Sequence, residues 1–238
     1  MKPLMKQEWH HLLFAHWPVD AALINSLLPP GMKAQIAEGT AWISVVPFSM
    51  RNIRFVGTPA IPGASALLEL NVRTYVQVGS VSGVYFFSLD ANHRLAVWFA
   101  KRFFYLNYRN ASMVMEPAED GFRFRSQVLS LNESKGAFQA QYVPKNDQKP
   151  SEMDGLANWL TNRDTLLTST VQGEIFEGRV FHPKWELTDA TLSIEVMTVD
   201  VGHGIEIKNK PALIQYAEKV QVITTGIRRL ILSTDRFY

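Results

Sequence analysis

The sequence of 238 residues contains no cysteine. This absence excludes disulfide bonds, thiolate nucleophiles and cysteine-ligated zinc or iron–sulfur centres. Long apolar runs are missing too, since no segment approaches the roughly 18 to 20 apolar residues that cross a bilayer. The N-terminal segment is interrupted by Lys6, Glu8, His10 and His11, so it lacks the continuous apolar core of a signal peptide. We therefore expect a cytoplasmic protein without a membrane partner.

An excess of charge of one sign is also lacking. Lysine and arginine number 24 against 22 aspartate and glutamate, so the net charge of +2 provides no long-range field for phosphates. We expect no nucleic-acid partner. The nucleophile elbow Gly-x-Ser-x-Gly, a phosphate-binding glycine loop and a dinucleotide fingerprint are all absent, so no cofactor is expected.

The histidines offer no pattern that predicts a metal site. His10 and His16 share the parity of one expected strand, but six residues of a straight strand separate them by about 20 Å. That separation is too large for both side chains to hold one ion.

Short segments rich in β-branched and aromatic residues recur along the chain, with turn residues between them, and predict a mainly β (α+β with few helices) fold. The expected strands are 9–17, 41–48, 67–78, 83–89, 108–115, 122–129, 137–143, 165–171, 174–181, 191–199 and 213–222. The expected helices are 20–28, 92–104 and 155–160. A polar, proline-bounded stretch at 144–153 predicts an exposed loop within a single domain covering 1–238.

The segment 67–78 separates its side chains into two faces, because alternate residues of a strand point to opposite sides. Its polar face carries five residues: Glu69, Asn71, Arg73, Tyr75 and Gln77. Such a face can simply meet water. It can also line a cavity, and the following strand favours that alternative.

The next strand has apolar residues on both faces. Tyr85, Phe87 and Leu89 share one side, and Val84 and Phe86 share the other, which indicates a sheet that is covered on both sides. If the two strands form a hairpin, the carboxylate and guanidinium of the polar face are buried and must be paired or meet a ligand. An arginine there suits a carboxylate, because its planar fork donates two parallel hydrogen bonds.

Several segments together resemble the YqjF-like family of uncharacterised bacterial proteins. They are Trp9-His10, His16-Trp17-Pro18-Val19, 27–31 (LLPPG), Ala41-Trp42, 47–50 (PFSM), 69–76 (ELNVRTYV), 83–91 (GVYFFSLDA) and 182–185 (HPKW). This family is similar in turn to the acetoacetate decarboxylase superfamily. The resemblance implies a strongly curved, largely closed antiparallel sheet, or barrel, around an internal cavity.

The same resemblance implies that the reactive segment of that superfamily is altered here. In the decarboxylases a helix leads into Phe-Pro-Lys-Lys-x-Ala, where the first lysine forms a Schiff base and the second lowers its pKa. In this chain Tyr108 stands at the place of the first lysine and Arg109 at that of the second. Only an amine can form the imine, so Schiff-base decarboxylation at this position is excluded. Lys101 reads as a surface lysine, and Glu69 matches the superfamily's cavity glutamate.

Three functions stay open at this point. The first is an enzyme with lyase- or isomerase-type chemistry on a small organic acid or carbonyl compound. In it, Arg73 or Arg109 holds the anion, Glu69 is the general acid or base, and Tyr108 or Tyr75 donates a hydrogen bond.

The second is a binding protein that uses the same cavity without chemistry, lined by Tyr85, Phe87 and Trp98 and with Asn71 among the ligand contacts. The third is an oligomeric scaffold in which the aromatic residues form the core or a homo-oligomeric interface.

Overall fold

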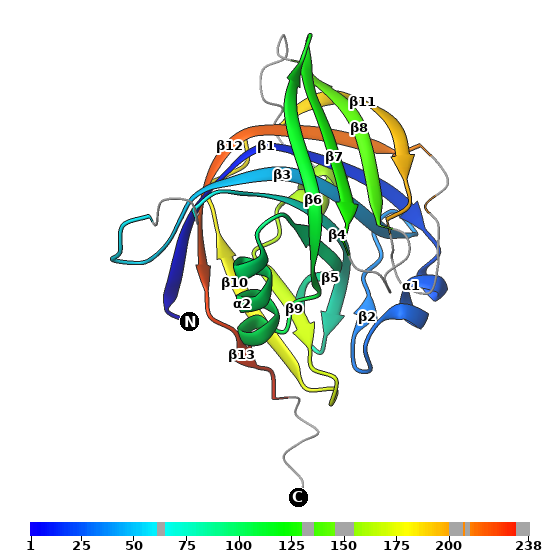
Figure 1. The fold of residues 1–238 in the computed structure, drawn as a ribbon. Coiled ribbons are helices and arrows are strands. Elements are labelled where there is room, and N and C mark those ends of the chain that lie inside the picture. Colours follow the sequence, from blue (N-terminus) through cyan, green and yellow to red (C-terminus); the bar gives the residue numbers. More distant parts are fainter. Residues whose placement is uncertain (61–64, 130–135, 146–154, 200–206, 208–209, 232–238) are drawn as a thin grey trace, which may run out of the picture.

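The computed structural model describes residues 1–60, 65–129, 136–145, 155–199, 207 and 210–231, and these ranges contain three helices and thirteen strands (Figure 1). The helices are α1 (Ala21–Leu27), α2 (Arg94–Phe104) and α3 (Gly155–Thr161). The strands are β1 (Pro3–Val19), β2 (Lys33–Ala34), β3 (Ala41–Phe55), β4 (Leu67–Val78), β5 (Val81–Ala91), β6 (Tyr108–Ala118), β7 (Gly121–Val128), β8 (Ala137–Pro144), β9 (Thr165–Ser169), β10 (Ile175–Phe181), β11 (Thr188–Met197), β12 (Leu213–Thr225) and β13 (Arg228–Arg229). None of the helices in these ranges combines the length and apolar character needed to cross a bilayer.

The mainly β fold expected from the sequence is confirmed, and each expected strand and helix is present. β2 and β13 escaped prediction because two residues carry no readable alternation. Most of the loop expected at 144–153 lies outside the described residues.

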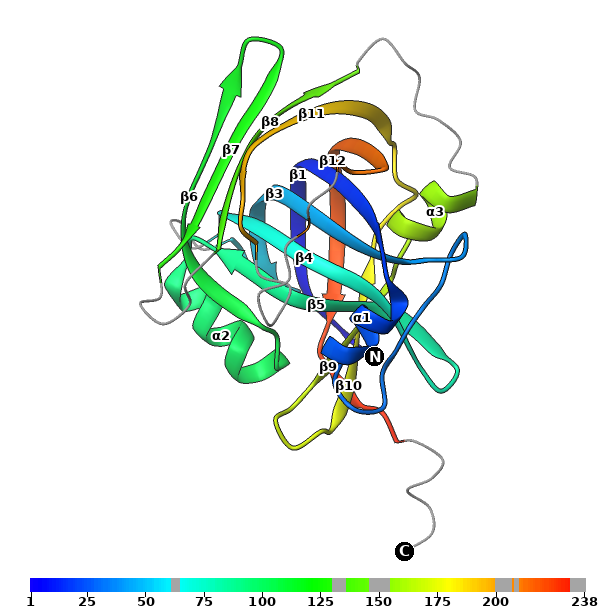
Figure 2. The ribbon, with the colours of Figure 1, turned by 90° about the vertical axis from the view of Figure 1, so that its right-hand side faces the viewer.

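All thirteen strands belong to one sheet, which closes on itself twice. The strand order is β13-β10-β9-β5-β6-β7-β8-β11-β12-β1-β3-β4-β2, with further pairings of β4 with β5 and of β10 with β12. The first pairing closes a ring of β5, β6, β7, β8, β11, β12, β1, β3 and β4, which we call the first ring. The second closes a ring of β5, β9, β10, β12, β1, β3 and β4, the second ring. β12, β1, β3, β4 and β5 form a wall shared by both rings, and Figure 2 shows these strands curving together.

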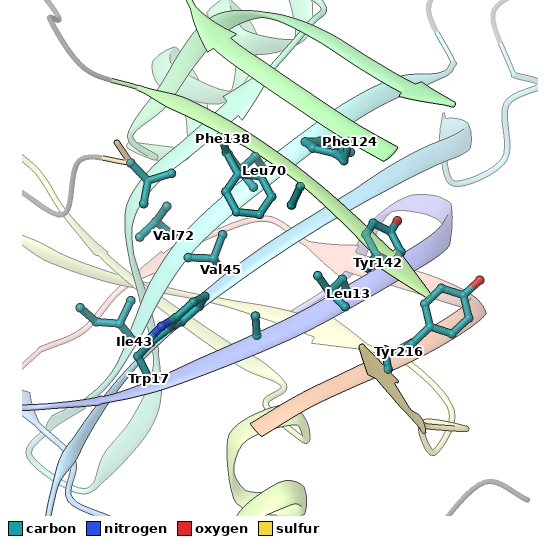
Figure 3. Close-up of a cluster of buried hydrophobic side chains, with 14 of the residues drawn as sticks. Leu13, Trp17, Ile43, Val45, Leu70, Val72, Phe124, Phe138, Tyr142 and Tyr216 are labelled. Carbon is teal, nitrogen blue, oxygen red and sulfur yellow. The ribbon is translucent and has the colours of Figure 1, made fainter. Parts of the chain in front are cut away.

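Because side chains alternate along each strand, the shared wall presents one set to each ring interior. The first interior is filled by an apolar cluster that joins the wall to β7 and β8 (Figure 3). Its labelled members include Leu13, Trp17, Val45, Leu70, Val72, Phe124, Phe138 and Tyr142. The second interior holds a separate cluster with Leu12, Phe14, Val46, Phe48 and Trp185. Asn71 and Arg73, on the polar face of β4, point into this second interior, whereas Gln77 at the end of the same face is exposed.

A bulge at His11 resets the parity of β1. The φ angle of His11 is 54°, and the pairing of β1 with β3 shifts register between His10 and Ala15. Trp9 and Leu12 therefore both point into the second interior, although one has an odd and the other an even position in the strand. The expectation that His10 and His16 lie on one face is wrong, because the bulge intervenes and only His16 points inward.

β5, α2 and β6 form a parallel crossover in this mostly antiparallel sheet, and β5 also pairs in parallel with β9. β5 and β6 pair in parallel at Leu89 with Tyr108 and Asp90 with Arg109, as the intervening helix allows. The helix begins where His93 Nδ1 accepts a hydrogen bond from the backbone N–H of Ala96 (3.2 Å). This connection brings the segment that follows α2 against the shared wall.

The close approach of the β8 backbone requires glycine at position 121, the first residue of β7. A Cβ atom there would lie 2.1 Å from the backbone oxygen of Tyr142 and 2.9 Å from Cα of Val143. We expect Gly121→Ala to lower the free energy of unfolding by about 1 to 3 kcal/mol, since backbone atoms of β8 must move. Gly226→Ala, whose added methyl meets nothing within 4 Å, is the control. Equal urea midpoints for the two variants would contradict this close approach.

Candidate functional site

A small cavity lies in the second interior. Its volume is about 40 Å³, room for only a few water molecules. Its lining comes from β1, β3, β4, β5, β9, β10, the end of α3 and the segments after α3 and β10. The lining residues are Trp9, Leu12, Phe14, Val46, Phe48, Asn71, Arg73, Val84, Phe86, Thr161, Arg163, Thr165, Leu166, Val180, His182 and Trp185.

Arg73 contributes a guanidinium group without a counter-ion to this cavity. The residue is 9% exposed, and its Nη2 donates to the backbone oxygen of Leu160 (3.1 Å). Its Cζ lies 5.7 Å from the ring centre of Phe14 and 5.9 Å from that of Tyr75. Its Nε has no hydrogen-bond partner, and among the described residues no carboxylate forms an ion pair with it.

Arg163 provides a second guanidinium group to the same space. Its Nε donates to the backbone oxygen of Trp159 (2.6 Å), and its Cζ lies 4.0 Å from the ring centre of Trp159 and 5.2 Å from that of Tyr75. Its Nη2 is buried without a partner. Burial lowers the pKa of Arg163 to about 10, and the charge on Arg73 acts in the same direction. With a pKa of about 10, Arg163 is charged at neutral pH. Together the two guanidinium groups make the cavity positive.

Tyr75 supports the two guanidinium groups through a buried hydrogen-bond chain. The backbone oxygen of Leu160 can only accept, so Tyr75 Oη donates to it (2.8 Å) and accepts from Ser44 Oγ (2.6 Å). Ser44 Oγ in turn accepts from His16 Nδ1 (2.7 Å). Burial, reinforced by the Arg73 charge, holds the pKa of His16 well below its usual range. The imidazole is therefore neutral and adds no counter-charge to the cavity.

Glu69 and Tyr108 form a buried acidic pair next to the cavity. Tyr108 Oη donates to Glu69 Oε2 (2.7 Å). Burial raises the pKa of Glu69 to about 8, although hydrogen bonds from Tyr108 and Asn71 act against it. Burial, together with the neighbouring Glu69, also raises the pKa of Tyr108 well above 10. Both groups hold their protons at neutral pH, and Tyr108 acts as a hydrogen-bond donor.

Arg109 is already paired with a carboxylate. Its Nε and Nη2 bind the two carboxylate oxygens of Asp90 at 2.6 and 3.0 Å, and Asp90 is fully buried. Arg109 also lies outside the cavity lining. Of the two arginines proposed as alternatives for holding the anion, Arg73 lines the cavity and Arg109 does not.

The expectation that Tyr85, Phe87 and Trp98 line the cavity is wrong for the cavity described here. Tyr85 and Phe87 pack against each other with ring centres 5.7 Å apart, while Val84 and Phe86 face the cavity. Trp98 is 61% exposed on α2. Both faces of β5 are apolar, so alternation alone could not tell which of them faces inward.

Arg163 and Trp185 are two lining residues with unpartnered polar atoms that sequence reasoning missed. Arg163 lies between a helix and a strand, where no periodicity marks its side chain as inward. The one available signal was Trp159, four residues earlier at the spacing of helical neighbours. Among the described residues, no three His, Asp or Glu side chains form a group that could hold a metal ion.

Comparison with known proteins assigns this chain to a family. The family model DUF2071, described as an uncharacterized conserved protein, matches residues 6–221. The chain belongs to the DUF2071 family. This DUF2071 chain is also 40% identical over 226 residues to the uncharacterized protein YqjF of Bacillus subtilis (strain 168), covering 95% of this chain and 92% of YqjF. The expected YqjF-like resemblance is confirmed.

Solved structures similar to this DUF2071 chain share its fold at low sequence identity. Acetoacetate decarboxylase from Legionella pneumophila has a TM-score of 0.65 at 10% identity, over 97% of this chain and 90% of that one. The enduracididine biosynthesis enzyme MppR, complexed with pyruvate, has a TM-score of 0.64 at 11% identity, over 97% and 92% of the two chains. The acetoacetate decarboxylase-like fold is therefore confirmed.

Proposed function

We propose that the cavity binds a small organic acid, whose carboxylate is held by Arg73 and Arg163. The observation that carries this proposal is the pair of guanidinium groups with unpartnered N–H atoms at one cavity, without an ion-paired carboxylate among the described residues. Buried charges of one sign are costly unless an opposite charge meets them. The planar forks of two arginines suit a carboxylate. The enzyme MppR, which shares this fold, is known in complex with pyruvate, an acid of the proposed class.

The acid–base chemistry that we assign to this site uses Glu69. A carboxyl group with a pKa of about 8 is a proton donor at neutral pH and a base just above it. Tyr108 keeps Glu69 in place and donates to it. Such a pair suits lyase- or isomerase-type proton transfer on the bound acid. No lysine is among the lining residues of the described cavity, which supports a mechanism without a Schiff base.

Binding without turnover is the second candidate, and one observation favours it. Glu69 and Tyr108 hydrogen-bond to each other and are not among the lining residues of the cavity, where Asn71 stands next along the strand. Turnover of a bound acid by the wild type that is lost in Glu69→Gln would favour the enzyme. Saturable binding without product, in both proteins, would favour the binding protein.

Binding itself is tested by a thermal-shift panel of two- to four-carbon carboxylic, keto and hydroxy acids. A ligand at 100 times its dissociation constant adds about 2.7 kcal/mol, or roughly 5 to 11 °C for a chain of this length. We expect Arg73→Met to abolish the shift, because the anion loses its buried partner. Arg125→Met, which removes an exposed guanidinium paired with Glu116, is the matched control and should keep it.

An acid that raises the melting temperatures of Arg73→Met and Arg125→Met equally would contradict this assignment. Lack of any shift across the panel, with all proteins folded, would also count against a cavity for small acids.

A further inference from the structure

We propose that the cavity selects a small hydroxy acid, whose hydroxyl group donates to Asn71, over the corresponding keto acid. This inference rests on the proposed function, because it requires a carboxylate held by Arg73 and Arg163. It names the class of acid from the hydrogen-bonding groups that the cavity leaves unpaired.

Four buried polar atoms on cavity-lining residues have no partner among the described residues. They are Arg73 Nε, Arg163 Nη2, Trp185 Nε1 and Asn71 Oδ1. The first three are N–H donors and the fourth is an acceptor. Because buried polar groups in folded proteins are nearly always paired, a fitting ligand supplies acceptors for three atoms and a donor for one.

The two arginines together account for the carboxylate. Both guanidinium groups lie over the ring of Tyr75, at 5.9 Å for Arg73 and 5.2 Å for Arg163. Arg73 also lies over Phe14, and the ring centre of Phe14 is 5.2 Å from that of Trp185. The indole N–H of Trp185 and the Asn71 carbonyl then remain for a second polar group of the ligand.

The orientation of the Asn71 amide follows from Glu69. The two residues occupy alternate positions on the inward face of β4. A hydrogen bond from the Asn71 side chain lowers the pKa of the Glu69 carboxyl group. Only the amide N–H₂ can donate in this way. The carbonyl oxygen is consequently turned away from Glu69, and it is this atom that has no partner.

A hydroxyl group satisfies both remaining atoms, because it can accept from the Trp185 N–H and donate to Asn71 Oδ1. A keto oxygen only accepts, so it would leave the Asn71 carbonyl unpaired and facing another lone pair. A buried acceptor left unpaired weakens binding by about 10- to 100-fold. Sites built around a substrate hydroxyl discriminate in this manner against analogues that lack it.

Titration calorimetry with lactate, pyruvate and propionate tests the inference. These probes share a three-carbon acid and differ at the second carbon, which carries a hydroxyl group, a keto oxygen or only hydrogen. We expect wild-type protein to bind lactate at least about tenfold more tightly than pyruvate or propionate. Asn71→Leu should bring the lactate affinity down to that of pyruvate, whereas Asn162→Leu, an exposed control, should preserve the preference.

Pyruvate binding as tight as lactate binding, or tighter, in the wild type would overturn the hydroxy-acid inference and leave the proposed function standing. It would mean that Asn71 presents its amide N–H₂ to the ligand. A lactate preference that survives Asn71→Leu in folded protein would overturn the role of Asn71. Absence of binding by all three acids would overturn the proposed function, and the inference with it.

Discussion

Glu69→Gln should remove a large pH dependence from the stability of this protein. The usual pKa of the carboxyl is 4.5 and the folded value is about 8. Below pH 4.5 the group is protonated in both the folded and the unfolded chain, and its contribution to stability is fully present. As the pH rises, the unfolded chain releases this proton first, so the free energy of unfolding falls until the folded carboxyl ionises near pH 8.

The expected size of this effect is large. From pH 4.5 to about 8, at 1.36 kcal/mol per pH unit, the loss amounts to roughly 5 kcal/mol. His16 acts in the opposite direction, since its depressed pKa makes the protein less stable as the pH falls below its ordinary value of 6.5. The wild-type curve minus the Glu69→Gln curve cancels this contribution, because both proteins contain His16.

Urea unfolding of both proteins at pH 5, 6.5 and 8 measures this difference. We expect the free energy of unfolding of Glu69→Gln, relative to that of the wild type, to increase at each higher pH. Between pH 6.5 and 8 the increase should be about 2 kcal/mol. Glu116→Gln, which alters an exposed carboxylate, is the control and should follow the wild type. Parallel curves for Glu69→Gln and the wild type would show that Glu69 is ionised in the folded protein.

Arg109→Met should destabilise the protein by about 3 to 5 kcal/mol, because it leaves the buried carboxylate of Asp90 without its guanidinium partner. This loss follows from the pairing of Arg109 within the fold and would occur with or without a ligand. Adding Asp90→Asn to Arg109→Met should remove much of this destabilisation, because a neutral amide at position 90 does not need a positive partner. Urea unfolding of the two single variants and the double variant gives the coupling directly.

Arg125→Met is the matched control for this pair. Its ion pair with Glu116 is exposed, with side chains 46% and 42% accessible, so its removal should cost less than about 1 kcal/mol. Near-wild-type stability of Arg109→Met, combined with loss of acid binding, would contradict the structural role and restore Arg109 as a ligand-binding residue.

The parts of the site that were predictable from sequence are those fixed by local alternation. The pattern of β4 predicted one polar face, and Glu69, Asn71 and Arg73 do lie toward the second interior. Their burial followed from the apolar character of the neighbouring strand. Here a period of two, read over a long strand, was sufficient.

The remaining parts depend on contacts between distant segments. The placement of Arg163 requires α3 to pack on Tyr75. The hydroxyl group of Tyr75 donates a hydrogen bond to the backbone oxygen of Leu160, which is 85 residues away in sequence. The left-handed backbone conformation of β1 occurs at His11 rather than at a glycine. The sequence therefore contains no signal that the side chains of β1 change faces at this residue. The double closure of the sheet rests on two pairings that no local pattern encodes.

The central claim is that Arg73 and Arg163 together hold the carboxylate of a small acid in the second interior. A crystal structure of the protein with the acid that stabilises it most would test this most directly. We predict the ligand carboxylate within hydrogen-bonding distance of both guanidinium groups, at Arg73 Nε and Arg163 Nη2. A ligand found elsewhere, with only ordered water between the two arginines, would contradict the claim.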